Sequence, residues 1–217
     1  MSFRPAARQF FERRGAPTPP LPYDAEVEYL QSQGSQWIDT GYYATGETKI
    51  EVIFAGLQTS NKAVFGASNG NSFSGGELAL FWNGSLFDPV YPTGSNTSNV
   101  LYPRPSYSAD TKYTVAFDKS SIVINGSSQS VTGWSTEYAG TRTMYIFATH
   151  RQAGAIVPSQ MKLYSFKMTN AGSAVIDMIP VRFTNELGVS EGAMYDRVSG
   201  ALFRNAGTGA FTIGPDK

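Results

Sequence analysis

The stretch 112–130, KYTVAFDKSSIVINGSSQS, contains the pattern that decides the fold. Apolar residues alternate with polar or small ones over 113–117, and the alternation returns over 122–124. A period of two places alternate side chains on opposite faces of a β-strand. Asn125-Gly126 then predicts a hairpin turn, because both residues tolerate positive φ. This stretch therefore predicts consecutive antiparallel strands with one buried face.

The same period of two recurs along most of the chain. It appears over 50–54 and 144–148, and over 163–168 with Tyr164 expected on the same face as Phe166. No segment after residue 25 favours a helix, and the patterns suggest about a dozen short strands. We therefore predict an all-β fold, a two-sheet antiparallel β-sandwich. The Pro-, Ser- and Asn-rich stretch Gly84–Ser108 is expected to be a long irregular connection.

Composition excludes several classes of function. The chain has 217 residues, 17 basic and 17 acidic side chains, no cysteine and one histidine. Disulfides, thiolate metal sites and multi-histidine sites are therefore excluded. A net charge of zero argues against nucleic acid as a partner. No window approaches the roughly 20 apolar residues of a membrane span, so no membrane partner is expected. The first residues also lack the apolar run of a secretory leader.

The first 22 residues differ from the rest and form a separate region, 1–22, ahead of a domain at 23–217. In residues 1–14 four arginines stand against one glutamate, a local charge of +3. Four prolines between residues 17 and 22 predict a stiff, extended spacer. The region is either a disordered tail or a docking peptide held off the domain. The docking candidates are its aromatic and basic side chains, Phe3, Arg4, Arg8, Phe10, Phe11, Arg13 and Arg14.

Several motifs in order carry a resemblance to a known family. They are VEYLQSQGSQWIDTG at 27–41, MYIFA at 144–148 with KLYSFK at 162–167, DMIPVR at 177–182 with GAMYDRVSG at 192–200, and FRNAGTG at 203–209. The chain resembles the concanavalin A-like (laminin-G-like) jelly-roll domains of gut bacterial surface proteins and of phage and prophage structural proteins. The resemblance implies a jelly roll over residues 25–215. It also implies that the first and last strands, and hence the motifs near both ends, pair.

Catalytic signatures are sparse. The acidic spacings nearest to a glucanase motif, Asp24/Glu26/Glu28 and Glu47/Glu51, do not match one. No serine-hydrolase elbow accompanies His150, which is read as a loop histidine. We therefore predict a protein that is not an enzyme, with no catalytic residue, no metal site and no cofactor. Calcium is the one ion left open, and its candidate ligands are Asn83, Asp88, Asn96 and Asp110.

Sugar binding needs aromatic faces beside amide or hydroxyl groups. Phe81-Trp82-Asn83-Gly84, at the end of an expected strand, supplies that mixture together with two later tyrosines. The alternative is that the tryptophans belong to the core. The carbohydrate-binding candidates are Trp82, Asn83, Tyr91, Tyr102 and Trp134.

These inferences combine into one expected function. We expect a non-enzymatic phage virion accessory protein, a capsid decoration or a head or tail fibre component. Residues 1–22 would dock it on a capsid or tail protein, and a lectin-like domain would face host or mucosal glycans from the virion surface. A homo-oligomer is expected, a trimer by analogy with particle fibres. The alternative is a carbohydrate-binding or adhesion module that is secreted or held on a bacterial surface.

Overall fold

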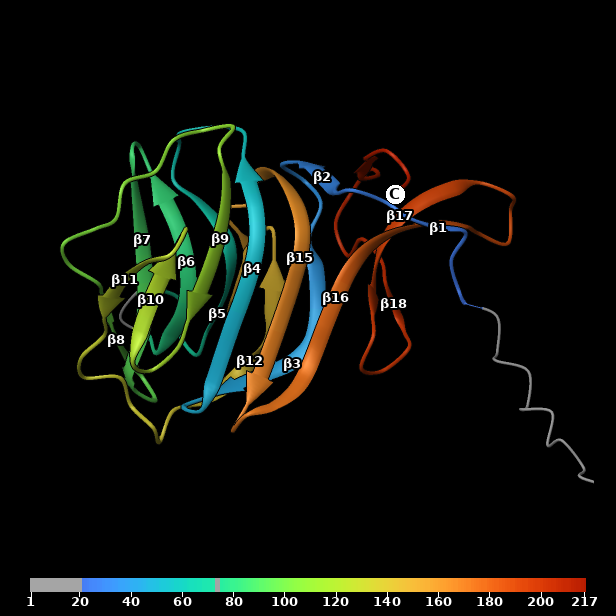
Figure 1. Ribbon diagram of the computed structural model, residues 1–217. Helices are drawn as coiled ribbons and strands as arrows, with labels where there is room; N and C mark the ends of the chain where they lie inside the picture. Colours follow the sequence, from blue (N-terminus) through green and yellow to red (C-terminus); the bar gives the residue numbers. More distant parts are fainter. Residues whose placement is uncertain (1–20, 73–74) are drawn as a thin grey trace, which may run out of the picture.

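The computed structural model of the protein describes residues 21–72 and 75–217, which fold into two facing β-sheets (Figure 1). The larger sheet has eleven strands and the smaller has eight, and the described residues include no helix. The larger sheet contains β1 (Ala25–Glu26), β2 (Leu30–Gln33), β4 (Thr48–Gly56), β9 (Lys112–Phe117), β10 (Ser121–Ile124), β11 (Ser127–Ser130), β15 (Gln160–Asn170), β16 (Ser173–Thr184), β17 (Ser190–Asp196), β18 (Leu202–Phe203) and β19 (Thr212–Ile213). The smaller contains β3 (Ile38–Thr45), β5 (Lys62–Ser68), β6 (Glu77–Asn83), β7 (Leu86–Gly94), β8 (Thr97–Val100), β12 (Ala139–Ile146), β13 (Thr149–Arg151) and β14 (Gly154–Ile156).

The strand order confirms the predicted all-β sandwich. The larger sheet runs β11-β10-β9-β4-β15-β16-β17-β18, and the smaller runs β14-β13-β5-β6-β7-β8, with β12 joining β5 to β3. Pairing is antiparallel except between β13 and β5. The hairpin β10–β11 turns at Asn125 and Gly126, with φ of 48° and 83°. The period of two therefore identified β9 and β10 correctly, and Asn125-Gly126 identified the turn that follows them.

The core lies between the inner faces of the two sheets. On β4 the buried residues are Ile50, Val52 and Phe54, which are at most 1% exposed, whereas the residues between them are partly exposed. Phe54 stacks on Trp82 from the opposite sheet, with ring centroids 6.2 Å apart. Burial of large rings from both sheets stabilises the sandwich without disulfides.

The two ends of the chain meet, as the resemblance implied. β19 pairs with β2, and Val27 bridges to Asp216. The backbone amides of Ala206 and Thr208 donate to the carbonyl oxygens of Trp37 and Ser35. The first and last motifs are therefore neighbours, and the last residues close the sheet beside the first.

Two sequence expectations are corrected. Gly84–Ser108 is not an irregular connection, because β7 and β8 occupy much of it and bury Phe87, Val90 and Tyr91. In β15 a β-bulge between Leu163 and Ser165 breaks the alternation. The added residue leaves Tyr164 partly exposed while Leu163 and Phe166 are both buried, as expected when two residues oppose one. Tyr164 therefore does not share a face with Phe166.

Candidate functional site

Trp82 belongs to the core. The side chain is 0% exposed and stacks on Tyr107 at 5.3 Å as well as on Phe54. A ligand on the surface cannot reach its ring in this conformation. The core alternative raised for the tryptophans is therefore the one found at Trp82.

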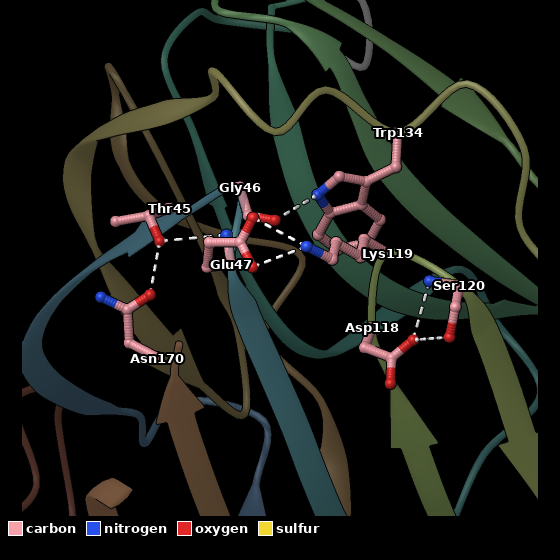
Figure 2. A network of polar contacts seen from close by, with 8 residues as sticks. All are labelled: Thr45, Gly46, Glu47, Asp118, Lys119, Ser120, Trp134 and Asn170. Atoms are coloured by element: carbon pink, nitrogen blue, oxygen red, sulfur yellow. Dashed lines mark hydrogen bonds and ion pairs between the residues drawn. The ribbon is translucent and has the colours of Figure 1, made fainter. Parts of the chain in front are cut away.

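Trp134 and Tyr91 form a second buried pair. Their rings stack at 6.2 Å with an interplanar angle of 2°. Figure 2 shows the Trp134 indole N–H donating to the carbonyl of Gly46, a 3.0 Å bond in the turn between β3 and β4. In the same view Lys119 pairs with Glu47 at 2.6 Å, which ties that turn to the β9–β10 turn. Trp134 is therefore bonded to the β3–β4 turn at one end of the sandwich, and neither ring of the buried pair is open to a sugar.

The other two predicted sugar-binding residues, Asn83 and Tyr102, are exposed but lie apart from these buried rings. Asn83 ends β6 at the surface. Tyr102 is 70% exposed, with Arg104 over its ring at 5.9 Å. The structure thus does not bring the five candidates together into one surface. The seven docking candidates between Phe3 and Arg14 lie outside the described residues.

Two of the carboxylates considered for metal binding or catalysis are held in ion pairs. Asp88 pairs with Arg104 at 2.9 Å, and Glu47 pairs with Lys119. Among the described residues no group of three or more histidines and carboxylates is placed to hold a metal. His150 lies in β13 rather than in a loop, with Nδ1 3.0 Å from the carbonyl oxygen of Thr143.

A different surface has the character of a binding site. The outer face of the larger sheet carries a depression of about 310 Å³ that crosses β9, β4, β15 and β16. These four strands are neighbours in the sheet, and β9, β4 and β15 lie side by side in Figure 1. Small-molecule pockets begin at about 300 Å³, so the depression has the size for a short segment of a polymer.

Cross-strand pairing arranges its side chains in rows. In the central row Ile53 is flanked by Thr114 and Ser165. In the next row Glu51 pairs with Lys167, and Lys167 faces Asp177 on the following strand. Acid and base therefore alternate across the sheet beside a row of hydroxyl groups.

One charged side chain of this row is not in an ion pair with another described residue. Glu51 bonds Lys49 at 2.7 Å, and Asp177 bonds Arg197 at 2.8 Å. Lys167, between the two acids, makes no ion pair within residues 21–72 and 75–217. Its ammonium can therefore donate hydrogen bonds to a ligand in the depression.

An aromatic group borders the other side of the hydroxyl row. The Tyr164 and Tyr29 rings meet edge to face at 5.8 Å. Lys112 lies 3.9 Å from the Tyr164 centroid, and Lys162 lies 5.1 Å from the Tyr29 centroid. Burial, followed by the nearby Glu28 carboxylate, raises the pKa of Tyr164. Its phenol is therefore neutral at physiological pH and can both donate and accept.

The sequence contained only part of the information needed to predict this outer face of the larger sheet. Alternation predicts that Glu51, Thr114 and Lys167 point away from the core. The bulge places Tyr164 beside them, and no local pattern indicated that bulge. Sequence reasoning therefore missed the face because it selected aromatic residues by type rather than by exposure.

Comparisons with known proteins give remote likenesses only. No family model and no curated protein matches the chain. Among solved structures, the enzymatically active domain of bacteriophage CBA120 tailspike protein 2 is 12% identical, with a TM-score of 0.40, over 67% of this chain and 24% of that chain. Domains LG4-5 of mouse laminin α1 are 10% identical, with a TM-score of 0.47, over 96% of this chain and 83% of that one. The K499G mutant of NanB sialidase from Streptococcus pneumoniae is 12% identical, with a TM-score of 0.42, over 88% of this chain and 39% of that one.

These values assign neither a family nor a function. The chain spans about a quarter of the tailspike chain and about two fifths of the sialidase chain. The described residues contain no helix with the length and hydropathy of a membrane span.

Proposed function

We propose that the protein binds glycans in the depression on the outer face of the larger sheet. The observation that carries the proposal is the juxtaposition of hydroxyl and charged groups in the depression with the Tyr164–Tyr29 ring pair beside it. The Thr114 and Ser165 hydroxyls, the free Lys167 ammonium and the Glu51 carboxylate supply donors and acceptors for sugar hydroxyls. Tyr164 adds an amphipathic ring of the kind that contacts the C–H faces of a sugar.

The charges around the depression favour a neutral, hydroxyl-rich ligand. Cations and anions are nearly equal in number there, so the face has no strong field of one sign. The cations are Lys49, Lys112, Lys162, Lys167 and Arg197, and the anions are Glu28, Glu51, Asp110 and Asp177. A neutral polysaccharide can use both signs through its hydroxyl groups.

Binding on this face is tested with the full chain on a glycan array, followed by calorimetry with the strongest neutral oligosaccharide. Lys167→Ala and Tyr164→Ala are each expected to weaken binding about tenfold, the effect of roughly 1.4 kcal/mol. Tyr43→Ala is the matched control, since Tyr43 is 53% exposed on the smaller sheet. Equal affinity of all four proteins, or no glycan bound by the unaltered chain, would refute the proposal.

We also propose that the domain is displayed on a virion as a capsid decoration or fibre component, docked through residues 1–22. What supports this is the sequence of that region, a +3 segment followed by a proline spacer. Replacing Arg4, Arg8, Arg13 and Arg14 with alanine is expected to abolish co-sedimentation with particles and to leave glycan affinity unchanged. Full co-sedimentation of the substituted chain would contradict docking. In that case a bacterial surface or secreted adhesion module becomes the better proposal.

A further inference from the structure

A second cavity lies at the opposite end of the larger sheet, where β18 leaves β17. It has a volume of about 340 Å³ and lies between the first residues of β17 and the segment 204–211. β18 pairs with β17 only at Met194 and Tyr195. Beyond Phe203 the chain turns away, because Asn205 bonds Trp37 and Gly207 rather than β17. The first half of β17 is therefore a strand edge beside a cavity.

The direction of the backbone groups on this edge follows from the neighbouring pairs. The Asp196 amide donates to the carbonyl of Ala201, on the β18 side. The backbone N–H and C=O groups of successive residues point to alternate sides of a strand. Those of Met194, Gly192 and Ser190 therefore also point to the β18 side. Among the described residues neither Ser190 nor Gly192 has a backbone partner there. Gly192 is nevertheless buried, and buried amides and carbonyls are normally hydrogen-bonded.

The walls of the cavity add an apolar contact, a cation and the Glu191 carboxylate, which accepts a hydrogen bond from the Asn185 side-chain amide. Phe211 lines the inner side, and Val189, 52% exposed, lies at the entrance. The Arg204 guanidinium lies 4.5 Å from the centroid of the Phe183 ring. Arg204 has no carboxylate partner within the described part of the chain. The cavity can thus accommodate one apolar and one acidic side chain of a segment bound along the β17 edge.

We propose that this cavity is a β-augmentation site, in which an extended, acidic polypeptide segment of a partner adds a strand to the β17 edge. Backbone groups of the incoming segment bond Ser190 and Gly192, as in other strand-addition complexes. An apolar side chain contacts Phe211, and a carboxylate bonds Arg204. Such a segment must carry backbone amides, which excludes a proline-rich one. The site is separate from the glycan face.

The test uses the full chain and capped pentapeptides that alternate valine with glutamate, assayed by fluorescence anisotropy. Ser190→Pro removes the amide that faces the cavity, and Ser190→Ala keeps it. Proline is tolerated at the first residue of a strand, and circular dichroism verifies that the variant folds. We expect Ser190→Pro to weaken peptide binding at least tenfold and Ser190→Ala to leave it unchanged. Arg204→Gln should weaken the glutamate peptides but not their glutamine counterparts.

A second arm keeps the test decisive if Ser190→Pro does not fold. Peptides with alternate backbone amides methylated have the same side chains but cannot pair with a strand edge. Tighter binding of the unmethylated peptide to the unaltered chain supports the site. Equal binding of both peptides, or no binding of either at millimolar concentration, overturns it. Glycan affinity of Ser190→Pro should equal that of the unaltered chain.

Discussion

At the scale of single residues, Asp196 makes the densest set of hydrogen bonds in the turn between β17 and β18. Its carboxylate, in a residue 2% exposed, accepts bonds from the backbone amides of Asp177, Val198 and Ser199 and from the Ser199 hydroxyl. Burial favours the neutral acid, but the hydrogen bonds together outweigh it and lower the pKa of Asp196. The charged form therefore stabilises the fold.

We expect Asp196→Asn to reduce the free energy of unfolding by about 1–3 kcal/mol at pH 7, because buried amides lose a charged acceptor. A lowered carboxyl pKa gives stability that is present above the unfolded pKa of about 3.9 and is lost as pH falls through the folded value. The difference from the unaltered chain should therefore shrink below about pH 4. Urea unfolding at pH 7, 5 and 3 measures it. A difference that stays constant with pH would contradict this role.

Residue type alone could not separate the core aromatic residues from the exposed ones. Trp82 and Trp134 have the chemistry of sugar-binding residues, yet both are core residues. Trp82 faces inward from β6, and Trp134 packs on Tyr91 and Phe117 from the connection between β11 and β12. Tyr164 lies on the outer face of the sheet because of a bulge that depends on the pairing of β15 with β4. Exposure of an aromatic ring depends on tertiary contacts, which a single strand pattern does not contain.

At the scale of elements, the hairpin β13–β14 is held to the smaller sheet by a buried ion pair. Arg151 bonds the Glu77 carboxylate at 2.8 Å, and the Thr149 hydroxyl bonds the same group at 2.9 Å. The Glu77 side chain is 0% exposed. Burial raises the pKa of Glu77, and the bonds from Arg151 and Thr149 oppose that rise.

Arg151→Ala is expected to cost about 3–5 kcal/mol at pH 8, because it leaves a buried carboxylate without its cation. A carboxyl group whose pKa is raised by folding destabilises the protein as the pH rises from the pKa of the unfolded state through the pKa of the folded state. Removing Arg151 raises the folded-state pKa of Glu77 further. The loss of unfolding free energy should therefore be smaller at pH 5, where protonation of Glu77 removes its unpaired charge. Thermal unfolding at both pH values checks this, with Arg142→Ala as the control on a neighbouring strand. An equal or larger cost at pH 5 would show that Glu77 is not the group responsible.

Strands with strict alternation and marked turns could be predicted, as at β4 and β10–β11. Strands within Gly84–Ser108 could not, because the prolines and serines in β7 and β8 resemble loop composition, although β7 pairs with β6 and β8 pairs with β7. Local composition therefore underestimates strands whose stability comes from their neighbours in the sheet.

At the scale of the whole molecule, the fold closes where its first and last residues pair. The final residues bond the first strands through Gly214 to Tyr29, Glu28 to Pro215 and Lys217 to Glu26. These contacts join segments separated by nearly the whole chain, so bringing them together has a loop-closure entropy cost. The contacts of the complete sandwich offset that cost. The resemblance to jelly-roll domains implied this closure, because a jelly roll brings its first and last strands together.

Deleting residues 212–217 is therefore expected to destabilise the entire sandwich rather than to fray one edge. The deletion removes β19 and uncovers Leu30 on β2, a residue 0% exposed in the intact fold. Losing several backbone bonds at about 1 kcal/mol each approaches the total stability of about 5–15 kcal/mol typical of a domain. Urea unfolding followed by far- and near-ultraviolet circular dichroism should show one transition shifted to much lower urea. Lys217→Ala, which keeps the backbone bond to Glu26, is the control. A deletion variant with an unchanged midpoint would mean that the two ends are held independently, and the closure would then be a local feature of β2.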